Sequence, residues 1–359
     1  MRLEEFGWNS GYQSLFQQDW EMQEGAALHE HSRDLAIEPG RVRLARQAGC
    51  VLFTARGEVE ATVAGRLSQA GERRPVVGDW VAFSWQERRI EAVLARRTQI
   101  ARRRPGAKAE PQVLAANVDL LLVVSAFGRD FSLGRLERYL LLARQGGAAP
   151  VVVLNKLDEC SDPAAALRQV RPVGGDAPVV LMSALDAVGM EDLLRLIEPA
   201  QTAALVGSSG VGKSTIINRL LGEERQRVRE LGDANRRGRH TTTDRELFVL
   251  PGGQLLIDSP GLRELQLWAD PESIESGFLD IDELAGECRF RDCRHQGEPG
   301  CAVVAAVERG DIDARRLENY HKIGRELRRL ELQVDDQAAY EERRRLKRLH
   351  KQYRKIPHR

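Results

Sequence analysis

Apolar and polar residues alternate in short runs over one part of the chain, from Gly40 to Arg104. Each run covers only a few positions before glycine or a cluster of charged residues interrupts it. Alternation with a period of two over such lengths is typical of β-strands that have one buried face. Five strands are therefore expected, at Arg41–Arg46, Cys50–Ala55, Glu58–Val63, Trp80–Trp85 and Ile90–Ala95.

The close spacing of these strands favours a small β-barrel of the oligonucleotide/oligosaccharide-binding (OB) type over a β-sandwich. The end of this segment is strongly basic. Its Lys and Arg residues are Arg96, Arg97, Arg102, Arg103, Arg104 and Lys108. They form either a solvated surface or a grip for single-stranded nucleic acid. The sequence leaves both interpretations open.

From Val118 onward, near-continuous apolar runs alternate with stretches of helical periodicity. Strands are expected at Val118–Val124, Val151–Leu154, Val179–Met182 and Ala203–Val206, and helices at Leu133–Arg144, Pro163–Val170 and Met190–Ile197. Apolar strands separated by helices predict a parallel sheet covered on both faces. After Leu262 the strand pattern ends, and a Cys/His cluster and long polar helices follow.

Residues 1–37 are rich in Gln and Glu and also contain aromatic side chains, namely Phe6, Trp8, Tyr12, Phe16 and Trp20. This extension is either a helix that docks on another surface or a poorly ordered terminus. Met1–Glu5 is acidic early and no apolar run follows it, so we expect no secretory signal.

A length of 359 residues predicts two or three domains. Charged residues make up 30% and hydrophobic residues 42%, as in soluble globular proteins. The net charge of +1 hides a basic tail, since Glu341–Arg359 holds nine Lys/Arg against two Glu. No apolar run is long enough for a membrane span. We expect a cytoplasmic protein in which Cys50 and Cys160 are ordinary packed residues.

A glycine-rich segment fits the phosphate-binding pattern GxxxxGK[ST] without a mismatch, and it lies between an expected strand and an expected helix. Its residues are Gly207, Ser208, Ser209, Gly210, Val211, Gly212, Lys213 and Ser214. Such glycines let backbone N–H groups surround phosphates, which the helix N-terminus also attracts. Lys213 is expected to contact the β- and γ-phosphates, Ser214 to bind Mg²⁺, and Thr215 to complete the nucleotide-binding set. A glycine-rich turn without a ligand is the less favoured alternative.

The expected strand Gln254–Ile257 leads into Asp258-Ser259-Pro260-Gly261, which fits the DxxG motif. There Asp258 would hold Mg²⁺ through water, and the Gly261 N–H would contact the γ-phosphate. Gly238–Thr243 lies in the switch I position, and one of its three threonines is the expected Mg²⁺ ligand.

Leu262 follows Gly261, where many small GTPases have a glutamine that orients the attacking water. Because leucine cannot orient water by hydrogen bonding, His240 is our candidate catalytic residue. Packing of His240 within the switch is the equally open alternative.

The choice of base rests on Asn155-Lys156-Leu157-Asp158, directly after an expected strand. An ionised Asp158 only accepts hydrogen bonds, so it can take both the N1–H and the 2-amino hydrogens of guanine. Adenine offers no such donor pair. Ser183-Ala184 follows the next strand and fits the companion loop, whose backbone N–H meets the guanine carbonyl.

These guanine motifs precede the phosphate loop, whereas ordinary GTPases have the reverse order. A doubly wound sheet tolerates such a circular permutation, because chain ends that lie close together can be joined and the chain reopened elsewhere.

Three thiols and one imidazole fall within 14 residues, as Cys288-x4-Cys293-x-His295-x5-Cys301. This set makes a closed tetrahedral zinc site with no open position, hence a structural one. Unrelated cysteines are the less favoured alternative.

Together these residues resemble the RsgA (YjeQ) family, bacterial circularly permuted GTPases that assist late maturation of the small ribosomal subunit. The resemblance rests on the segments Pro75–Val81 and Ala116–Asp119, on NKLD, SA, GSSGVGKS, GRHTTT and DSPG, and on the zinc spacing. It implies that the barrel and the zinc domain clamp the small subunit, which stimulates GTP hydrolysis. Residues 1–37 and the basic tail are less typical, so no function is carried onto them.

The sequence therefore predicts a multidomain α/β protein. Its expected parts are an N-terminal extension (1–37), an OB-like β-barrel (38–108), a circularly permuted P-loop GTPase domain (109–270) and a zinc-binding domain with basic C-terminal helices (271–359). We expect a monomeric GTP hydrolase that uses Mg²⁺ with GTP and one structural Zn²⁺, and that binds the small ribosomal subunit and its rRNA but no membrane. The alternative is an RNA-binding assembly module whose nucleotide is mainly structural.

Overall fold

The structure is a computed structural model of the chain, and it divides into two compact units. It describes residues 2–24, 36–46, 48–65, 67, 74–103, 111–128, 131–222, 245–258 and 278–334. One unit comprises Met1–Ala101 with Val113–Leu265, and the other Arg102–Gln112 with Gln266–Arg359. Within the described ranges no helix has both the length and the apolar character needed to cross a bilayer. The predicted four-part division of the chain stays a prediction.

The five strands predicted from the alternating pattern are present and close into a barrel. They are β1 (Ile37–Ala45), β2 (Cys50–Thr54), β3 (Gly57–Val63), β4 (Trp80–Ser84) and β5 (Arg89–Val93). The pairing order is β1–β2–β3–β5–β4, and β4 closes the barrel on β1. Alternate side chains such as Val42, Leu52 and Phe83 fill its buried core. The prediction of an OB-like barrel is confirmed.

Three aromatic residues near the N-terminus, Phe6, Trp8 and Tyr12, pack on this barrel. A 3-10 helix, η1 (Leu3–Phe6), precedes helix α1 (Ser10–Glu24). The Phe6 ring stacks on Phe53 with centroids 4.3 Å apart, and Trp8 meets Trp80 at 4.6 Å. Of the two interpretations left open for residues 1–37, a docking helix therefore fits the described residues 2–24, and the surface that it covers belongs to the same chain.

A second set of strands continues from the barrel as a mainly parallel sheet. It contains β8 (Leu120–Ala126), β9 (Ala149–Asn155), β10 (Val179–Leu181), β11 (Thr202–Val206), β12 (Arg245–Val249) and β13 (Leu255–Asp258). Their order is β10–β9–β8–β11–β13–β12, and only β12 runs antiparallel to its neighbour β13 in this set. The strand that precedes the glycine-rich segment, β11, is thus inserted between two strands from distant parts of the sequence.

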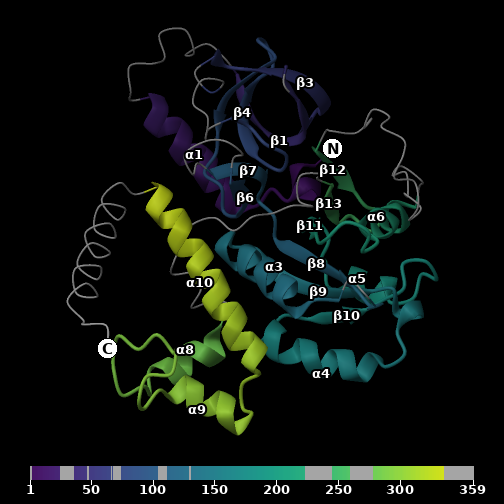
Figure 1. Ribbon diagram of the computed structural model, residues 1–359. Helices are drawn as coiled ribbons and strands as arrows, with labels where there is room; N and C mark the ends of the chain where they lie inside the picture. The colour runs from purple at the N-terminus through teal and green to yellow at the C-terminus, as the bar shows by residue number, and fades with distance from the viewer. Residues whose placement is uncertain are drawn as a thin grey trace, which may run out of the picture. The chain divides into compact units, whose positions relative to one another are not determined.

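Helices cover both faces of this sheet, as the apolar strands predicted (Figure 1). On one face lie α3 (Leu133–Gln145) and α4 (Pro163–Gly174), which contact each other, with α3 against β8 and β9. On the other face, α5 (Met190–Arg195) and α6 (Lys213–Leu221) share a core with alternate strand residues such as Leu122, Val124 and Leu205. Burial on both faces explains why these strands are apolar throughout.

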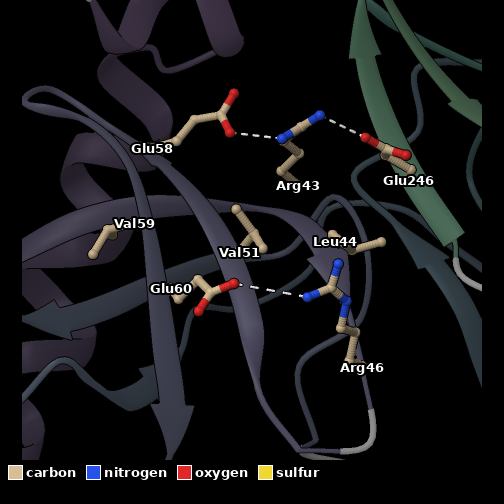
Figure 2. A pocket seen from close by; sticks show the side chains of 8 residues that line it. All are labelled: Arg43, Leu44, Arg46, Val51, Glu58, Val59, Glu60 and Glu246. Atoms are coloured by element: carbon tan, nitrogen blue, oxygen red, sulfur yellow. Dashed lines mark hydrogen bonds and ion pairs between the residues drawn. The ribbon is translucent and has the colours of Figure 1, made fainter.

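Strand β12 joins the sheet to the barrel, because it also pairs with β1 at Leu44 and Ala45. Beside this junction lies an open groove of about 400 Å³. In it Arg43 donates to Glu58 of the barrel and to Glu246 of β12, both at 2.6 Å, as Figure 2 shows. Glu246 is in turn the cross-strand neighbour of Asp258. The barrel is therefore tied to the strand next to the DxxG segment.

A two-stranded sheet that the sequence did not predict follows the barrel. Its strands are β6 (Gln99–Arg103) and β7 (Pro111–Ala116), which pair only with each other among the described residues. They cover part of the basic segment that was predicted only as the barrel's end.

The second unit contains three helices within its described residues, α8 (Leu279–Ala285), α9 (Ala302–Arg309) and α10 (Ala314–Val334). Arg316 of α10 forms a two-pronged ion pair with Asp280 of α8, at 2.6 Å for each bond. Phe278 meets Tyr320 edge to face at 5.4 Å. Among the described residues of this unit few apolar side chains are buried, namely Phe278, Ile281, Cys301, Val303, Ala306, Ile312, Ile323 and Leu327. This small core leaves room for a metal to contribute to folding.

Candidate functional site

The predicted nucleotide-binding residues lie where parallel strands end. Asn155 is the last residue of β9, Gly207 follows β11 directly, and Asp258 is the last residue of β13. Ser183 and Ala184 follow β10. The carboxyl ends of parallel strands meet at one edge of a sheet, which is where α/β proteins bind their ligands.

The glycine-rich segment forms a turn whose backbone conformation favours glycine at three positions. Gly207, Gly210 and Gly212 all have positive φ, at 153°, 85° and 97°. A Cβ on Gly207 would lie 2.3 Å from the Val124 carbonyl oxygen, so no other residue fits there.

Helix α6 begins at Lys213, directly after this turn. The buried Lys213 ammonium donates to the carbonyl oxygens of Gly207, at 2.6 Å, and of Ser208. Ser214 and Thr215 occupy the first turn of α6 and are half-buried. An ammonium, two hydroxyls and the N-terminus of a helix thus meet at one place, which suits a bound phosphate group.

Asn155 joins the glycine-rich turn to the loop that carries Ala184. Its amide nitrogen donates to the Val211 carbonyl at 2.8 Å, and its amide oxygen accepts from the Ala184 N–H at 3.0 Å. Asn155 is buried, so both bonds are shielded from water. Two segments that the sequence only suggested as partners are in direct contact through one side chain.

Asp158 presents an exposed carboxylate beside Asn155. Lys156 adopts a left-handed conformation, with φ of 64°, and the 3-10 helix η4 (Leu157–Glu159) follows it. The Ser183 hydroxyl contacts Asp158 at 2.7 Å and Asp186 at 3.0 Å. The contact with Ser183 therefore orients the Asp158 carboxylate, which stays exposed and can accept hydrogen bonds from two N–H groups of a ligand.

Oxygen ligands suited to Mg²⁺ are present on two neighbouring elements. Ser214 lies at the start of α6, and Asp258 ends β13, the strand that pairs with β11. Hydroxyl and carboxylate oxygens are the donors that Mg²⁺ prefers. Gly261, His240, the switch I threonines and Leu262 lie outside the described residues.

The four predicted metal ligands of the second unit come together. Their ligand atoms all lie within 4.8 Å of one another. Cys288 Sγ lies 3.9 Å from Cys301 Sγ, and His295 Nδ1 lies 3.6 Å from Cys288 Sγ and 3.4 Å from Cys301 Sγ. A tetrahedral Zn²⁺ with ordinary bond lengths sets S···S near 3.8 Å and S···N near 3.5 Å, roughly the observed spacing. The donor set and its spacing therefore fit a metal ion.

The ionisation of Cys288 and of His295 also suits a cation. Burial lowers the pKa of His295, so its imidazole stays neutral, which is the form that ligates metals. Desolvation opposes ionisation of Cys288, but hydrogen bonds from the Ala302 and Val303 N–H groups outweigh it and lower the pKa of that thiol. The pKa of Cys293 rises to about 12: its bond with the His295 backbone favours the thiolate, but desolvation and the neighbouring thiols oppose it more strongly.

One residue that supports this cluster was not predicted from the sequence. The Glu298 carboxylate accepts from the backbone N–H groups of Arg294, at 3.0 Å, and Gln296, at 2.7 Å. It thereby fixes the loop between Cys293 and Cys301. A glutamate in a polar loop gives no pattern from which this role could be found.

Comparison with known proteins agrees with this geometry. The family model described as RsgA GTPase matches residues 93–268. A protein of Opitutus terrae named small ribosomal subunit biogenesis GTPase RsgA is 47% identical over 87% of this chain and 89% of its own length. The chain belongs to the RsgA GTPase family.

Solved structures show the same fold as this RsgA family member. The crystal structure of YjeQ from Thermotoga maritima is 27% identical, with a TM-score of 0.61 over 81% of this chain and 99% of that chain. The structure titled YloQ, a circularly permuted GTPase, is 24% identical, with a TM-score of 0.57 over 84% of this chain and 98% of that chain. The fold is thus a circularly permuted GTPase with an N-terminal barrel.

A second family model, described as 50S ribosome-binding GTPase, matches residues 202–351. Its match begins at β11, which leads into the glycine-rich turn. The segments with Asn155, Asp158, Ser183 and Ala184 precede this match, in agreement with the permuted order. The chain is a GTPase.

Proposed function

We propose that this GTPase assists maturation of the small ribosomal subunit, and that GTP hydrolysis times the release of the GTPase from the subunit. The main observation in support of the nucleotide site is the buried Asn155. Its side chain is hydrogen-bonded to Val211 of the phosphate loop and to Ala184 of the guanine loop. One side chain thereby sets the spacing between the triphosphate and the base. The names of the RsgA relatives support the small subunit as the partner.

The reaction is GTP + H₂O → GDP + phosphate, by in-line attack of water on the γ-phosphate. Lys213 and the N-terminus of α6 neutralise phosphate charge, which in the transition state is spread over the equatorial oxygens of the transferring group and builds up on the leaving oxygen. Ser214 would hold Mg²⁺ directly and Asp258 through water, and the ion would screen the phosphate oxygens. Gly261 and His240 complete the proposal: the Gly261 N–H contacts the γ-phosphate, and His240 orients the attacking water.

Base selection falls to Asp158, Ser183 and Ala184, with Lys156 and Leu157 shaping the turn between Asn155 and Asp158. We assign Zn²⁺ to the cluster of the second unit, one ion per chain in a structural role. The protein acts as a monomer in the cytoplasm. None of the five cysteines forms a disulfide in the structure, which supports a reducing compartment.

Exchange of one atom in Asp158 tests the guanine site. Asp158→Asn should weaken GTP binding and improve binding of xanthosine triphosphate, because an amide can donate to the 2-carbonyl of xanthine. The matched control is Asp162→Asn, since Asp162 caps α4 and asparagine caps a helix equally well. Nucleotide competition measures both variants. An Asp158→Asn protein with unchanged base preference would contradict the site.

A further inference from the structure

The loop that carries Ala184 is held from the side of α6 as well as by Asn155. This loop, residues 183–188, closes on itself through paired bonds between the backbones of Ser183 and Val188, both at 3.1 Å. Its outer part holds Leu185, whose side chain is largely exposed. A loop with an exposed apolar tip needs a contact from another element to keep its backbone in one place.

Arg219 supplies that contact. Its Nε donates to the Ala184 carbonyl at 3.2 Å, and its Nη2 donates to the Leu185 carbonyl at 2.7 Å. The guanidinium fork thus spans two consecutive peptide groups, which a lysine ammonium cannot do in the same way. Within the described ranges the structure shows no ion pair for Arg219, so both of its recorded partners belong to this loop.

Arg219 belongs to the same helix as the phosphate-binding lysine. Helix α6 begins at Lys213 and ends at Leu221, so the two residues are six positions, or about 9 Å of helix, apart. One rigid element therefore carries a phosphate contact near its start and the support of the guanine loop near its end. A cation in the last turn also favours the helix dipole, but that role does not require bonds to another loop.

We propose that Arg219 is a positioning residue for the guanine base of GTP and GDP. It holds the backbone of Ala184 and Leu185 against α6. The backbone N–H groups of this loop are thereby kept in position to contact the guanine base. This inference rests on the proposed guanine site and adds to it a residue outside the NKxD and SA motifs. Arg219 contacts neither the phosphates nor the reacting water.

The test separates base binding from phosphate binding. Arg219→Ala should raise the Kd for GDP and the KM for GTP by about threefold to tenfold, as loss of one or two partly exposed hydrogen bonds does. The kcat should change little, because the lost contact is the same in ground and transition states. Inorganic tripolyphosphate, which has no base, should compete as well against the variant as against wild type. Arg219→Lys should restore only part of the loss.

Arg195→Ala is the matched control, because Arg195 is an exposed arginine at the end of α5 that, among the described residues, pairs only with Glu191 and Asp192 in its own helix. Its GDP affinity should equal that of wild type. The proposal is overturned if Arg219→Ala binds GDP normally, or if it loses GDP and tripolyphosphate to the same extent. Asp158→Asn separates the two hypotheses: if it changes the base preference while Arg219→Ala has no effect, only the role of Arg219 fails.

Discussion

Among the polar side chains described, we expect replacement of Arg41 to cause the largest loss in the free energy of unfolding. Arg41 is 2% exposed. It donates to the carbonyls of Phe6, Gly78 (3.4 Å) and Asn117 (3.1 Å), and to the Thr202 hydroxyl at 2.8 Å. One guanidinium therefore joins the N-terminal segment, the barrel and the first residue of β11, which leads to the phosphate loop.

Arg41→Met keeps most of the stem and removes every one of these bonds. Hydrogen bonds to a charged group contribute about 1.5–3 kcal/mol each, and a buried acceptor left without a donor costs about 1–3 kcal/mol. Relief of the buried charge offsets part of this loss. Gly78 also keeps a second donor, the Asn117 amide at 3.1 Å. We expect a net loss of about 3 kcal/mol in the free energy of unfolding.

Urea unfolding followed by tryptophan fluorescence measures this loss, because Trp8 and Trp80 meet next to Arg41. The control is Arg43→Met on the same strand. The Arg43 side chain is 25% exposed, and its ion pairs with Glu58 and Glu246 are open to water, so its loss should cost at most about 1 kcal/mol. If Arg41→Met is as stable as Arg43→Met, the reasoning about the buried guanidinium is wrong.

Three further predictions follow from the two sites and the thiols. Lys213→Ala should lower GTP turnover at least about a hundredfold at saturating GTP and Mg²⁺, with an unchanged circular dichroism spectrum; near-normal turnover would contradict its phosphate role. Cys293→Ser should lose the one Zn²⁺ per chain in elemental analysis and unfold the second unit, yet keep GTP binding, whereas Cys160→Ser should change none of these; full zinc content in Cys293→Ser would contradict its role as a ligand. Burial raises the pKa of Cys50 to about 11, so at pH 8 only about one thiol in a thousand is ionised. A thiol reagent should therefore modify Cys160 in the folded protein but Cys50 only after unfolding, and fast labelling of Cys50 would contradict its burial.

The sequence was most informative where one local pattern determines the structure. The alternation around Val42 and Phe83 predicted the barrel strands, and the glycines around Lys213 predicted the turn between β11 and α6. Such signals need no distant partner, because steric limits and local burial produce them.

Features that depend on distant segments could not be predicted in the same way. Alternation with Val42 and Leu44 places Arg41 and Arg43 on the same polar face of the strand, and this pattern does not distinguish the two arginines. The structure buries Arg41, because the N-terminal segment covers its side chain, while Arg43 stays partly exposed. The pairing of β12 with β1, and the bonds of Arg219 to a loop before the phosphate-binding strand, likewise join parts with no common sequence pattern.

Under the proposed function, GTP hydrolysis by this chain responds to the small ribosomal subunit. The direct measurement is GTP turnover by the full chain alone, with purified small subunits, and with purified large subunits as the control. We expect slow turnover alone, a clear rise with small subunits, and no comparable rise with large subunits or with Lys213→Ala. Turnover that small subunits leave unchanged, or that both subunits raise equally, would contradict the proposed function and would favour an RNA-binding module with a structural nucleotide.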